Sequence, residues 1–544
     1  MKENMEHSFL GRKQIVDLIK RRVSDLKEGY RQNIALIGCQ HVGKSTVLQS
    51  FLEGFDDSAV GSVYLDLENR DLDYFVIKTC RSILYHFCRI KGLELHDDIG
   101  KLSASARGHI PATVDGVSSA LTALEKGRAA EAFDMTLSLP ETLAQECGLR
   151  TVIIYDEFQS ISGMGVPEAF RRLADHITTQ KHSLYILASS FQEQAARILE
   201  EELTLLFGSF ELVHLLPLDL NASLEFIERR LGGVKLSPTL RSFLADFTGG
   251  RPLYLDIISQ ELINLAAIYK QQEVYAPLLA QAVENLLFNR WGALSRHFEL
   301  CVERLCAGKN NRLVITVLFF LADGVHKLKD IVASCGAKQT QVSARLNFLA
   351  GEGVVEKNGP YFHIKDKLMA YWIRYIFQKR IKSIELEPGK QRDEFRAAIL
   401  EDINEFQSNC RKDLSSRVIE LLNCFENEHL NLYGRSYKLP MFKEAKSLRM
   451  GQSGGQGFDV IQAEADDGAW LLVLRKDPLA EKDISGVVEE VRKMGIRMRK
   501  CVLVPFSGID DTARLCALNE RMWIWNEPVL NSLMSLYGKS YIVP

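Results

Sequence analysis

The alternation of apolar runs with amphipathic stretches predicts the fold of the first 218 residues. Each apolar run has the length of a buried strand, and the stretches between the runs place apolar residues at helical spacing. We expect strands at 34–37, 63–67, 151–155, 184–190 and 211–218. Strands that alternate with helices form a parallel, doubly wound sheet, so the fold class is α/β. Residues 91–136 are polar, rich in Gly and Ala and weakly periodic, and we expect an insertion or a mobile lid there.

The segment after the first strand fits the phosphate-loop pattern GxxxxGK[ST] at residues 38–45. Its glycines let backbone N–H groups turn inward around phosphate oxygens, Lys44 supplies a positive charge near the terminal phosphates, and the Ser45 hydroxyl can complete a magnesium shell. A chance glycine turn is the alternative, but the strand before the loop and the helix after it favour a nucleotide site. The expected contacts with ATP come from Gly38, Cys39, Gln40, His41, Val42, Gly43, Lys44, Ser45 and Thr46.

Two carboxylates follow the predicted strand at 151–155. Asp156 and Glu157 would lie at the carboxyl edge of the sheet, where the phosphate loop also lies. There Asp156 would hold Mg²⁺ together with Ser45, and Glu157 would polarise the attacking water. An acidic turn without a function is the alternative, and the combination with the loop argues against it. In ATPases with an extra strand between these two motifs, that strand ends in a polar sensor of the γ-phosphate, so we expect this role for Ser189 or Ser190.

Residues 219–305 have helical periodicity and predict a helical lid over the nucleotide. Within them, a break at Gly249-Gly250 precedes Arg251 at the start of a helix. This arrangement can direct the guanidinium into the nucleotide cleft. A helix cap followed by a surface arginine is the alternative.

Residues 306–378 predict a winged helix-turn-helix. Helices at 313–321, 328–333 and 339–350 precede a hairpin at 354–364. Residues 309–375 contain ten Lys and Arg against five Asp and Glu, a local positive excess in a chain of net charge −3. Small polar side chains on the third helix suit the major groove of double-stranded DNA. The expected DNA contacts are Lys338, Thr340, Gln341, Ser343, Asn347 and Lys357; a winged helix that only packs or regulates is the alternative.

Length and composition limit the remaining possibilities. The 544 residues suffice for three or four domains, and the 11 cysteines contain no CxxC pair, as expected of thiols in a reducing cytoplasm. The polar first residues predict no signal peptide, and no apolar stretch reaches the ~20 residues that cross a bilayer. We therefore expect a cytoplasmic protein without a membrane partner.

Four stretches together resemble the archaeal-type ATPase family, a prokaryotic branch of the STAND and AAA+ ATPases. They are Phe9-Leu10-Gly11-Arg12 and residues 38–46, 155–159 and 248–255, and the resemblance covers the first 300 residues, roughly. The resemblance implies a Mg²⁺-dependent ATPase in which Gly11 and Arg12 lie against the adenine. It also implies that Arg251 reports the γ-phosphate to the helical lid.

The chain departs from the family pattern at two places. Gln40 and His41 stand where the family often has two arginines. Members commonly carry an arginine after a P-L-[FY]-G turn, placed to act on a neighbouring subunit's nucleotide, and Ser209 stands there in this chain. An arginine finger contributes ~10³-fold or more to hydrolysis. We therefore expect slow hydrolysis, or an arginine such as Arg197 in this role.

After a helical linker at 379–416, residues 417–544 resemble the restriction-endonuclease-like (PD-(D/E)xK) domain that often ends archaeal-type ATPases. In that fold, an Asp on one strand and a Glu-x-Lys on the next hold a metal ion and align water. Asp459 and Lys476 are present, but Leu474 occupies the glutamate position. One carboxylate and one lysine hold Mg²⁺ poorly, and Glu420 or Glu464 could in principle supply a second carboxylate. We expect a vestigial nuclease that binds DNA or protein.

These patterns predict a nucleotide-switched, slowly hydrolysing ATPase that acts on double-stranded DNA through its winged helix and nuclease-like domain. Two alternatives stay open. The first is an active, ATP-regulated and metal-dependent DNA nuclease, and the second is a nucleotide-dependent scaffold or signalling switch without nucleic acid. A homo-oligomer or a partner protein is compatible with each.

Overall fold

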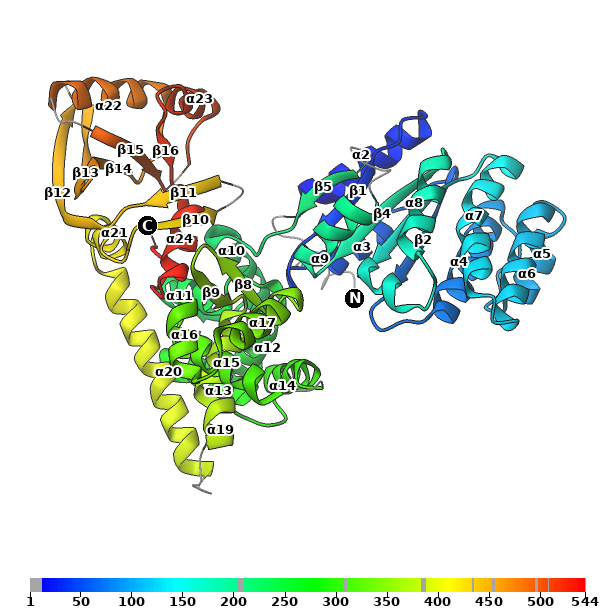
Figure 1. Cartoon of the computed structure of the whole chain (residues 1–544), viewed down its shortest axis with the longest axis horizontal. Helices are drawn as coiled ribbons and strands as arrows, with labels where there is room; N and C mark the ends of the chain where they lie inside the picture. Colours follow the sequence, from blue (N-terminus) through cyan, green and yellow to red (C-terminus); the bar gives the residue numbers. More distant parts are fainter. Residues whose placement is uncertain are drawn as a thin grey trace. The chain divides into compact units, whose positions relative to one another are not determined.

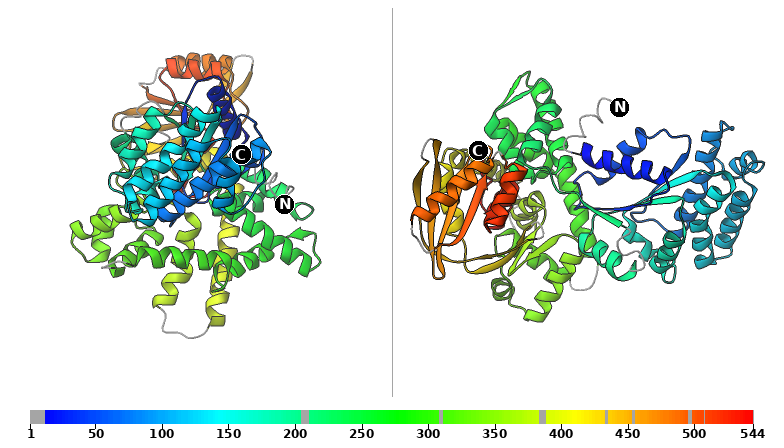
Figure 2. Two further views of the ribbon diagram at one scale, coloured as in Figure 1. Left: turned by 90° about the vertical axis from the view of Figure 1, so that its right-hand side faces the viewer. Right: turned by 90° about the horizontal axis from the view of Figure 1, so that it is seen from above.

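The computed structural model describes residues 12–203, 210–307, 311–382, 388–432, 435–452, 455–494, 498–506 and 508–543 (Figures 1 and 2). The chain forms two compact units. The first comprises the residues up to 218 together with 251–254, and the second comprises 219–250 and the residues from 255 onward.

The first unit contains a parallel five-stranded sheet, as the apolar runs predict. Its strands are β1 (Asn33–Ile37), β2 (Val60–Asp66), β3 (Arg150–Asp156), β4 (Ser183–Ser189) and β5 (Phe210–His214), in the spatial order β2-β3-β4-β1-β5. The last strand ends earlier than expected, because residues 215–218 are not part of it. The expected extra strand between the phosphate-loop strand and the acidic strand is β4. This α/β architecture is consistent with a P-loop NTPase fold.

Helices cover both faces of this sheet (Figures 1 and 2). One core cluster joins α2 (Lys13–Lys27) and α3 (Lys44–Glu53) to alternate strand residues such as Ile34 and Leu36. The other cluster joins the intervening residues, such as Ala35 and Ile37, to α4 (Leu72–Lys91), α8 (Ala169–Thr179) and α9 (Gln192–Arg197). This alternation arises because successive side chains of a strand point to opposite faces.

The expectation of a mobile lid at residues 91–136 is wrong. The segment is an insertion built of packed helices, α5 (Ile99–Ala106), α6 (Pro111–Glu125) and α7 (Ala129–Cys147). Their small residues explain the weak sequence pattern, since Ala120 and Ala123 are fully buried and a Cβ on Gly116 would lie 2.9 Å from Leu139. Alanine and glycine allow close helix contacts without the large apolar side chains that mark amphipathicity.

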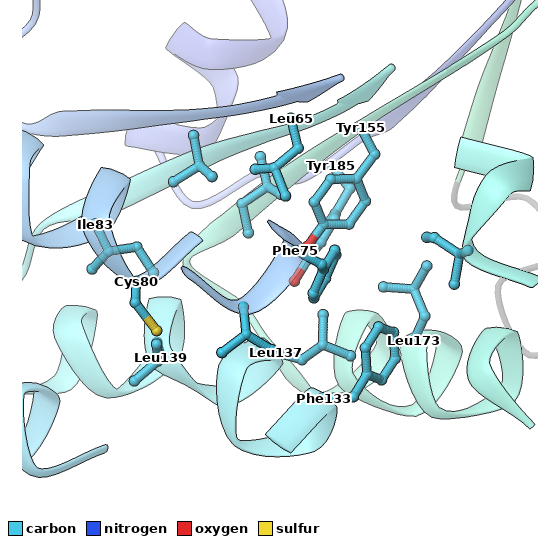
Figure 3. Close-up of a cluster of buried hydrophobic side chains, with 14 of the residues drawn as sticks. Leu65, Phe75, Cys80, Ile83, Phe133, Leu137, Leu139, Tyr155, Leu173 and Tyr185 are labelled. Carbon is cyan, nitrogen blue, oxygen red and sulfur yellow. The ribbon is translucent and has the colours of Figure 1, made fainter. Parts of the chain in front are cut away.

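Side chains of this insertion belong to the core of the first unit. Figure 3 shows Phe133 and Leu137 of α7 together with Phe75 and the strand residue Tyr155 in one apolar cluster. The ring centroid of Phe75 lies 5.0 Å from that of Phe133 and 5.5 Å from that of Tyr155. The insertion therefore supports the sheet that carries the phosphate loop.

The second unit begins with the predicted helices. They are α10 (Leu220–Leu231), α11 (Pro238–Thr248), α12 (Pro252–Ile268, whose first residues belong to the first unit), α13 (Ala276–Leu287) and α14 (Ala293–Leu305), with a small parallel pair β6 (Lys235–Leu236) and β7 (Glu273–Val274). Three helices and an antiparallel hairpin follow: α15 (Asn311–Ala322), α16 (Leu328–Cys335), α17 (Gln339–Gly351), β8 (Val355–Asn358) and β9 (Tyr361–Ile364). The helices α18 (Lys367–Trp372), α19 (Gln378–Lys382) and α20 (Pro388–Cys410) connect this segment to the last part of the chain.

The last part of the second unit contains a mixed five-stranded sheet in the order β12-β13-β14-β15-β16. Helix α21 (Leu414–Leu422) and a separate hairpin, β10 (Glu428–Leu432) and β11 (Arg435–Leu439), precede the sheet. Its elements are β12 (Phe442–Gln452), β13 (Gly455–Ala465), β14 (Gly468–Arg475), α22 (Glu481–Met494), β15 (Met498–Pro505), α23 (Asp511–Asn519), β16 (Trp523–Ile524) and α24 (Glu527–Leu536). The sequence pattern predicts β13 to β16 and misses β10, β11 and β12. Strand β12 is an edge strand with exposed Lys443, Lys446 and Arg449, so its sequence reads as polar.

In the described part of the chain, no helix is both long and apolar enough to cross a bilayer.

Replacing Phe133 tests whether the insertion is core. We expect Phe133→Ala to lower the free energy of unfolding by about 3–5 kcal/mol, because it removes a buried ring from a packed cluster. Thermal unfolding followed by circular dichroism measures the change. Leu95→Ala is the control within the same segment, since Leu95 is 42% exposed and its loss should have an effect within about 0.5 kcal/mol. If the two variants lowered the free energy of unfolding equally, the segment would not be part of the core, and the mobile-lid interpretation would be favoured.

Candidate nucleotide-binding site

The loop that joins β1 to α3 has a backbone that few residues other than glycine could form. A Cβ on Gly38 would collide with the carbonyl oxygen of Leu215, and Gly43 has a φ of 93°. His41 also has a positive φ, 66°, which is uncommon for a residue with a side chain. The N–H of Gly38 donates to the carbonyl of Ser189 at 3.1 Å, so the loop begins directly beside the end of β4.

Lys44 is the first residue of α3, and its side chain is only 4% exposed. The ammonium group donates to the carbonyl oxygens of Gly38 at 2.9 Å and Cys39 at 3.1 Å, and to the hydroxyl of Ser190 at 2.7 Å. Burial lowers the pKa of Lys44, although the nearby carboxylates of Glu157 and Asp156 oppose the shift. The loop thus holds a positive charge inside its own turn.

The Ser45 hydroxyl and the Asp156 carboxylate meet at the same edge of the sheet. The hydroxyl donates to Asp156 Oδ2 at 2.7 Å, and the Tyr64 hydroxyl donates to the same oxygen at 3.1 Å. Asp156 is 2% exposed, and burial raises the pKa of its carboxyl, although the Ser45 and Tyr64 hydroxyls oppose the shift. The sequence motifs predict the pairing of Ser45 with Asp156 but not the contact with Tyr64, because a tyrosine inside a strand has the pattern of a core residue.

Glu157 leaves the strand in a left-handed backbone conformation, with a φ of 53°. Its carboxylate accepts hydrogen bonds from Gln159 Nε2 at 2.9 Å and from the N–H of Ser190 at 2.9 Å, and it also accepts from the Ser190 hydroxyl. Lys44 Nζ lies 4.0 Å from Glu157 Oε1. Gln159 has no assigned role in the sequence analysis, yet it holds the carboxylate of the expected general base.

The two sensor candidates differ in position. The Ser189 hydroxyl is buried and accepts from the N–H of Phe191 at 3.1 Å, so it closes the turn after β4. The Ser190 hydroxyl lies between Lys44 and Glu157. Ser190 is therefore the one of the pair that faces the charged groups.

Two arginines brace the loop through its backbone. Arg251 is 5% exposed and donates to the carbonyl of Gln40 at 2.6 Å, and Arg12 donates to the carbonyls of Val42, at 3.3 Å, and Leu216. The rings of His41 and Tyr254 lie 5.5 Å apart at the same loop. Arg251 thus lies beside the loop, where its guanidinium binds the loop backbone. Gly11 and Ser209 lie outside the described residues.

The donor set fits a magnesium triphosphate. Ser45 and Asp156 offer two oxygen donors close together, and Mg²⁺ is a hard cation that combines one or two protein oxygens with phosphate oxygens and waters. Lys44 offers a buried ammonium group whose bonds to loop carbonyls can be exchanged for bonds to phosphate. Thr46 follows Ser45 in the first turn of α3.

The DNA candidates lie on and around α17. Val342, Leu346 and Leu349 are fully buried, as the helical wheel predicts, and Lys338, Thr340, Gln341 and Asn347 are exposed, while Ser343 is half-buried. Lys357 is exposed on β8, with its ammonium 5.8 Å from the centre of the Phe362 ring.

The nuclease candidates do not assemble a metal site. Asp459 pairs with Leu474 across β13 and β14, is 61% exposed and lies 3.7 Å from Arg449, while Lys476 is exposed just beyond β14. Glu464 is five residues from Asp459 on one strand, so the two side chains point to opposite faces of the sheet. Glu420 is bound by Lys412 at 2.7 Å and Arg417 at 3.1 Å. Among the described residues, no group of three His, Cys, Asp or Glu side chains could hold a metal ion.

Comparisons with known proteins give limited information. No protein-family model matches the chain, and no curated protein matches it. Solved structures that resemble it include a Walker-type ATPase of Pyrococcus abyssi (14% identity, TM-score 0.47, 65% of this chain and 93% of the other). They also include the ORC2 protein of Aeropyrum pernix (16%, 0.43, 69% and 95%) and the RuvB Holliday junction branch migration motor of Thermotoga maritima (13%, 0.32, 66% and 93%). These sequence identities and TM-scores do not assign an activity to the chain, so its function must be inferred from its own residues.

Tyr64 can be tested as a positioning residue for Asp156. We expect Tyr64→Phe to weaken Mg²⁺-dependent binding of a fluorescent ATP analogue about 10-fold, because a partner that orients a metal ligand is lost. The pKa of Asp156 should rise further without this donor, so binding should be lost at a higher pH on acidification.

Titration of the analogue with and without EDTA measures the effect of Tyr64→Phe. Without Mg²⁺ the variant and the parent should bind equally. Tyr30→Phe, at a residue that is 74% exposed, is the matched control. A loss of equal size with and without Mg²⁺ would mean that Tyr64 has only a structural role.

Proposed function

We propose that the chain is an ATP-binding, slowly hydrolysing ATPase of the AAA+ and STAND type whose nucleotide state controls a DNA-associated arm. The observation that carries this proposal is the 2.7 Å contact between the Ser45 hydroxyl and the Asp156 carboxylate at the edge that also holds Lys44 and Glu157. The proposed modules are an ATPase core at 1–218, a helical lid at 219–305, a winged helix at 306–378, a linker at 379–416 and a nuclease-like domain at 417–544.

Each residue of the site has a role in this proposal. A bound Mg²⁺ would neutralise charge on the phosphates, with Ser45 and Asp156 as its protein ligands. Lys44 would donate to the terminal phosphates, and Glu157 would accept a proton from the attacking water. Ser190 and Arg251 would respond to the γ-phosphate, while Gly11 and Arg12 would lie near the adenine.

Two features support a slow rate. Glu157 accepts hydrogen bonds from Gln159 and Ser190, so it must exchange these partners before it can bind the attacking water. Ser209 stands at the position where the resembling family commonly has an arginine, and Arg197, which is exposed at the end of α9, is the proposed substitute.

We propose that α17 contacts double-stranded DNA. Support comes from its exposed polar face and from the excess of Lys and Arg over Asp and Glu at residues 309–375. The hairpin β8-β9 would be the wing. The last domain would bind without cutting, because Leu474 faces Asp459 where cleavage needs a second carboxylate.

Two substitutions separate ATP binding from hydrolysis. Lys44→Ala should lower the affinity for ATP at least 10-fold, because a charge-assisted contact to phosphate is lost. Glu157→Gln should leave the affinity nearly unchanged and lower kcat by about 10²- to 10⁴-fold, because proton transfer is lost. A fluorescent ATP analogue and phosphate release measure the two quantities. A Lys44→Ala protein that binds and hydrolyses ATP like the parent would remove the ATPase proposal.

The contact of α17 with DNA is tested by fluorescence anisotropy of a labelled duplex with ATP, ADP or no nucleotide. Asn347→Ala should weaken binding about 5- to 100-fold, and Lys338→Ala should reduce the slope of log affinity against log salt by about 0.9. Lys126→Ala, at an exposed lysine of the first unit, is the control and should change neither quantity.

The same duplex should stay intact with Mg²⁺. Cleavage that Asp459→Ala abolishes would support the nuclease alternative. A parent protein that does not retain the duplex in any nucleotide state would support the scaffold or signalling switch.

A further inference from the structure

The loop between α13 and α14 exposes the side chain of Trp291. The indole is 85% exposed, whereas Trp372, Trp470 and Trp525 are at most 3% exposed and Trp523 is half-buried. An exposed indole does not contribute to stability the large free energy that burying its apolar surface would give. None of the functions proposed above uses this residue.

Hydrogen bonds order the backbone of the loop around Trp291. The N–H of Trp291 donates to Asn289 Oδ1 at 3.1 Å, the N–H of Gly292 donates to the carbonyl of Asn289 at 2.8 Å, and Asn289 donates to the carbonyl of Glu284 at 3.2 Å. A Cβ on Gly292 would collide with the carbonyl oxygen of Leu286, so the turn requires glycine there. The exposed indole is therefore presented by an ordered turn.

Three arginines belong to the loop or to the elements that adjoin it. Arg290 precedes it and is exposed, Arg296 lies in the first turns of α14 with 53% of its side chain exposed, and Arg380 donates to the carbonyl of Phe288 at 2.8 Å. Glu299 is the carboxylate that pairs with two of them, with Arg380 at 2.7 Å and with Arg296 at 3.7 Å. These three guanidinium groups and the one carboxylate together carry two net positive charges.

We propose that Trp291, Arg290 and Arg296 form a binding platform for single-stranded nucleic acid. The indole stacks on an unpaired base, and the two guanidinium groups bind the phosphates on either side of that base. A duplex cannot use the platform in this way, because its base faces are covered by their neighbours. The platform is separate from α17 and does not depend on nucleotide binding at the phosphate loop.

The surface favours this partner over a membrane or a protein pocket. Two large apolar side chains near the loop are also exposed, Leu300 of α14 at 49% and Ile381 beside Arg380 at 53%, and each has a charged residue next to it in the sequence. A membrane or a protein partner held by the hydrophobic effect needs a larger continuous apolar patch. Positive charge beside one aromatic ring matches the repeating phosphate and base of a single strand.

The test uses the full chain and a labelled oligothymidylate of about 20 nucleotides, measured by fluorescence anisotropy in the absence of ATP. Trp291→Ala should weaken binding of the single strand about 5- to 100-fold, and Trp291→Phe should restore most of it, because phenylalanine also stacks on a base. Arg290→Ala should reduce the slope of log affinity against log salt by about 0.7. Tyr30→Ala, at another exposed aromatic residue, should bind like the parent.

Two further readouts separate this proposal from duplex binding by α17. Trp291→Ala should leave duplex affinity unchanged, and Asn347→Ala should leave single-strand affinity unchanged. Oligothymidylate should quench part of the parent's tryptophan fluorescence, and Trp291→Phe should remove that quenching. Because the side chain is exposed, both Trp291 variants should keep the parent's thermal midpoint.

The proposal is overturned if the parent does not bind the single strand, or if Trp291→Ala binds it as tightly as the parent. It is also overturned if vesicles of anionic phospholipid, and not the oligonucleotide, change the Trp291 fluorescence.

Discussion

The parallel register of β1, β3 and β4 is the constraint on which the site depends. Ile37 pairs with Ser189 and Asp156 pairs with Ala188, so the phosphate loop, the acidic pair and the two serines all begin at one edge of the sheet. A slip of one residue would move a strand by about 3.3 Å and turn its side chains to the opposite face. The 2.7 Å contacts of Ser45 and Lys44 tolerate no such movement. A buried amide fixes the register, because Asn33 of β1 accepts from the N–H of Tyr185 in β4 at 3.0 Å, and a slip would leave both groups without a partner.

With the strands in this register, the site is a small network of buried charged groups, each of which has hydrogen-bond partners within the site. Lys44 and Asp156 are 4% and 2% exposed, and taking charged groups out of water is costly unless each is hydrogen-bonded. The loop carbonyls and Ser190 bind the ammonium group, and Ser45 and Tyr64 bind the carboxylate of Asp156. Under the proposed function, Lys44 would turn from these internal partners to phosphate oxygens, and Ser45 and Asp156 would turn to Mg²⁺.

The sequence predicts the parts of this structure that local patterns specify. The apolar runs identify β1 to β5, and the glycine spacing and the acidic ending identify the loop and the pair Asp156 and Glu157. Tyr64 and Gln159 cannot be found in this way, because their roles arise only when strands that are distant in sequence become neighbours. Helices α5 to α7 were missed because their contacts rely on small residues, and β12 was missed because an edge strand carries charged side chains. The five-residue spacing of Asp459 and Glu464 on one strand already predicts that these two carboxylates point to opposite faces of the sheet.

Packing within the second unit limits what the hairpin β8-β9 can touch. Its tip lies against β10: Asn358 Nδ2 donates to the carbonyl of Asn431 at 2.9 Å, and the N–H of Asn431 donates back to Asn358 Oδ1 at 2.8 Å. A Cβ on Gly359 would collide with the carbonyl of His429, and Tyr361 donates to the buried carboxylate of Glu428. Freeing the tip would break at least three hydrogen bonds at about 0.5–1.5 kcal/mol each and would expose that carboxylate. Under the proposed function, duplex contact therefore falls to α17 and to the exposed side of β8, and the tip joins the hairpin to the last domain.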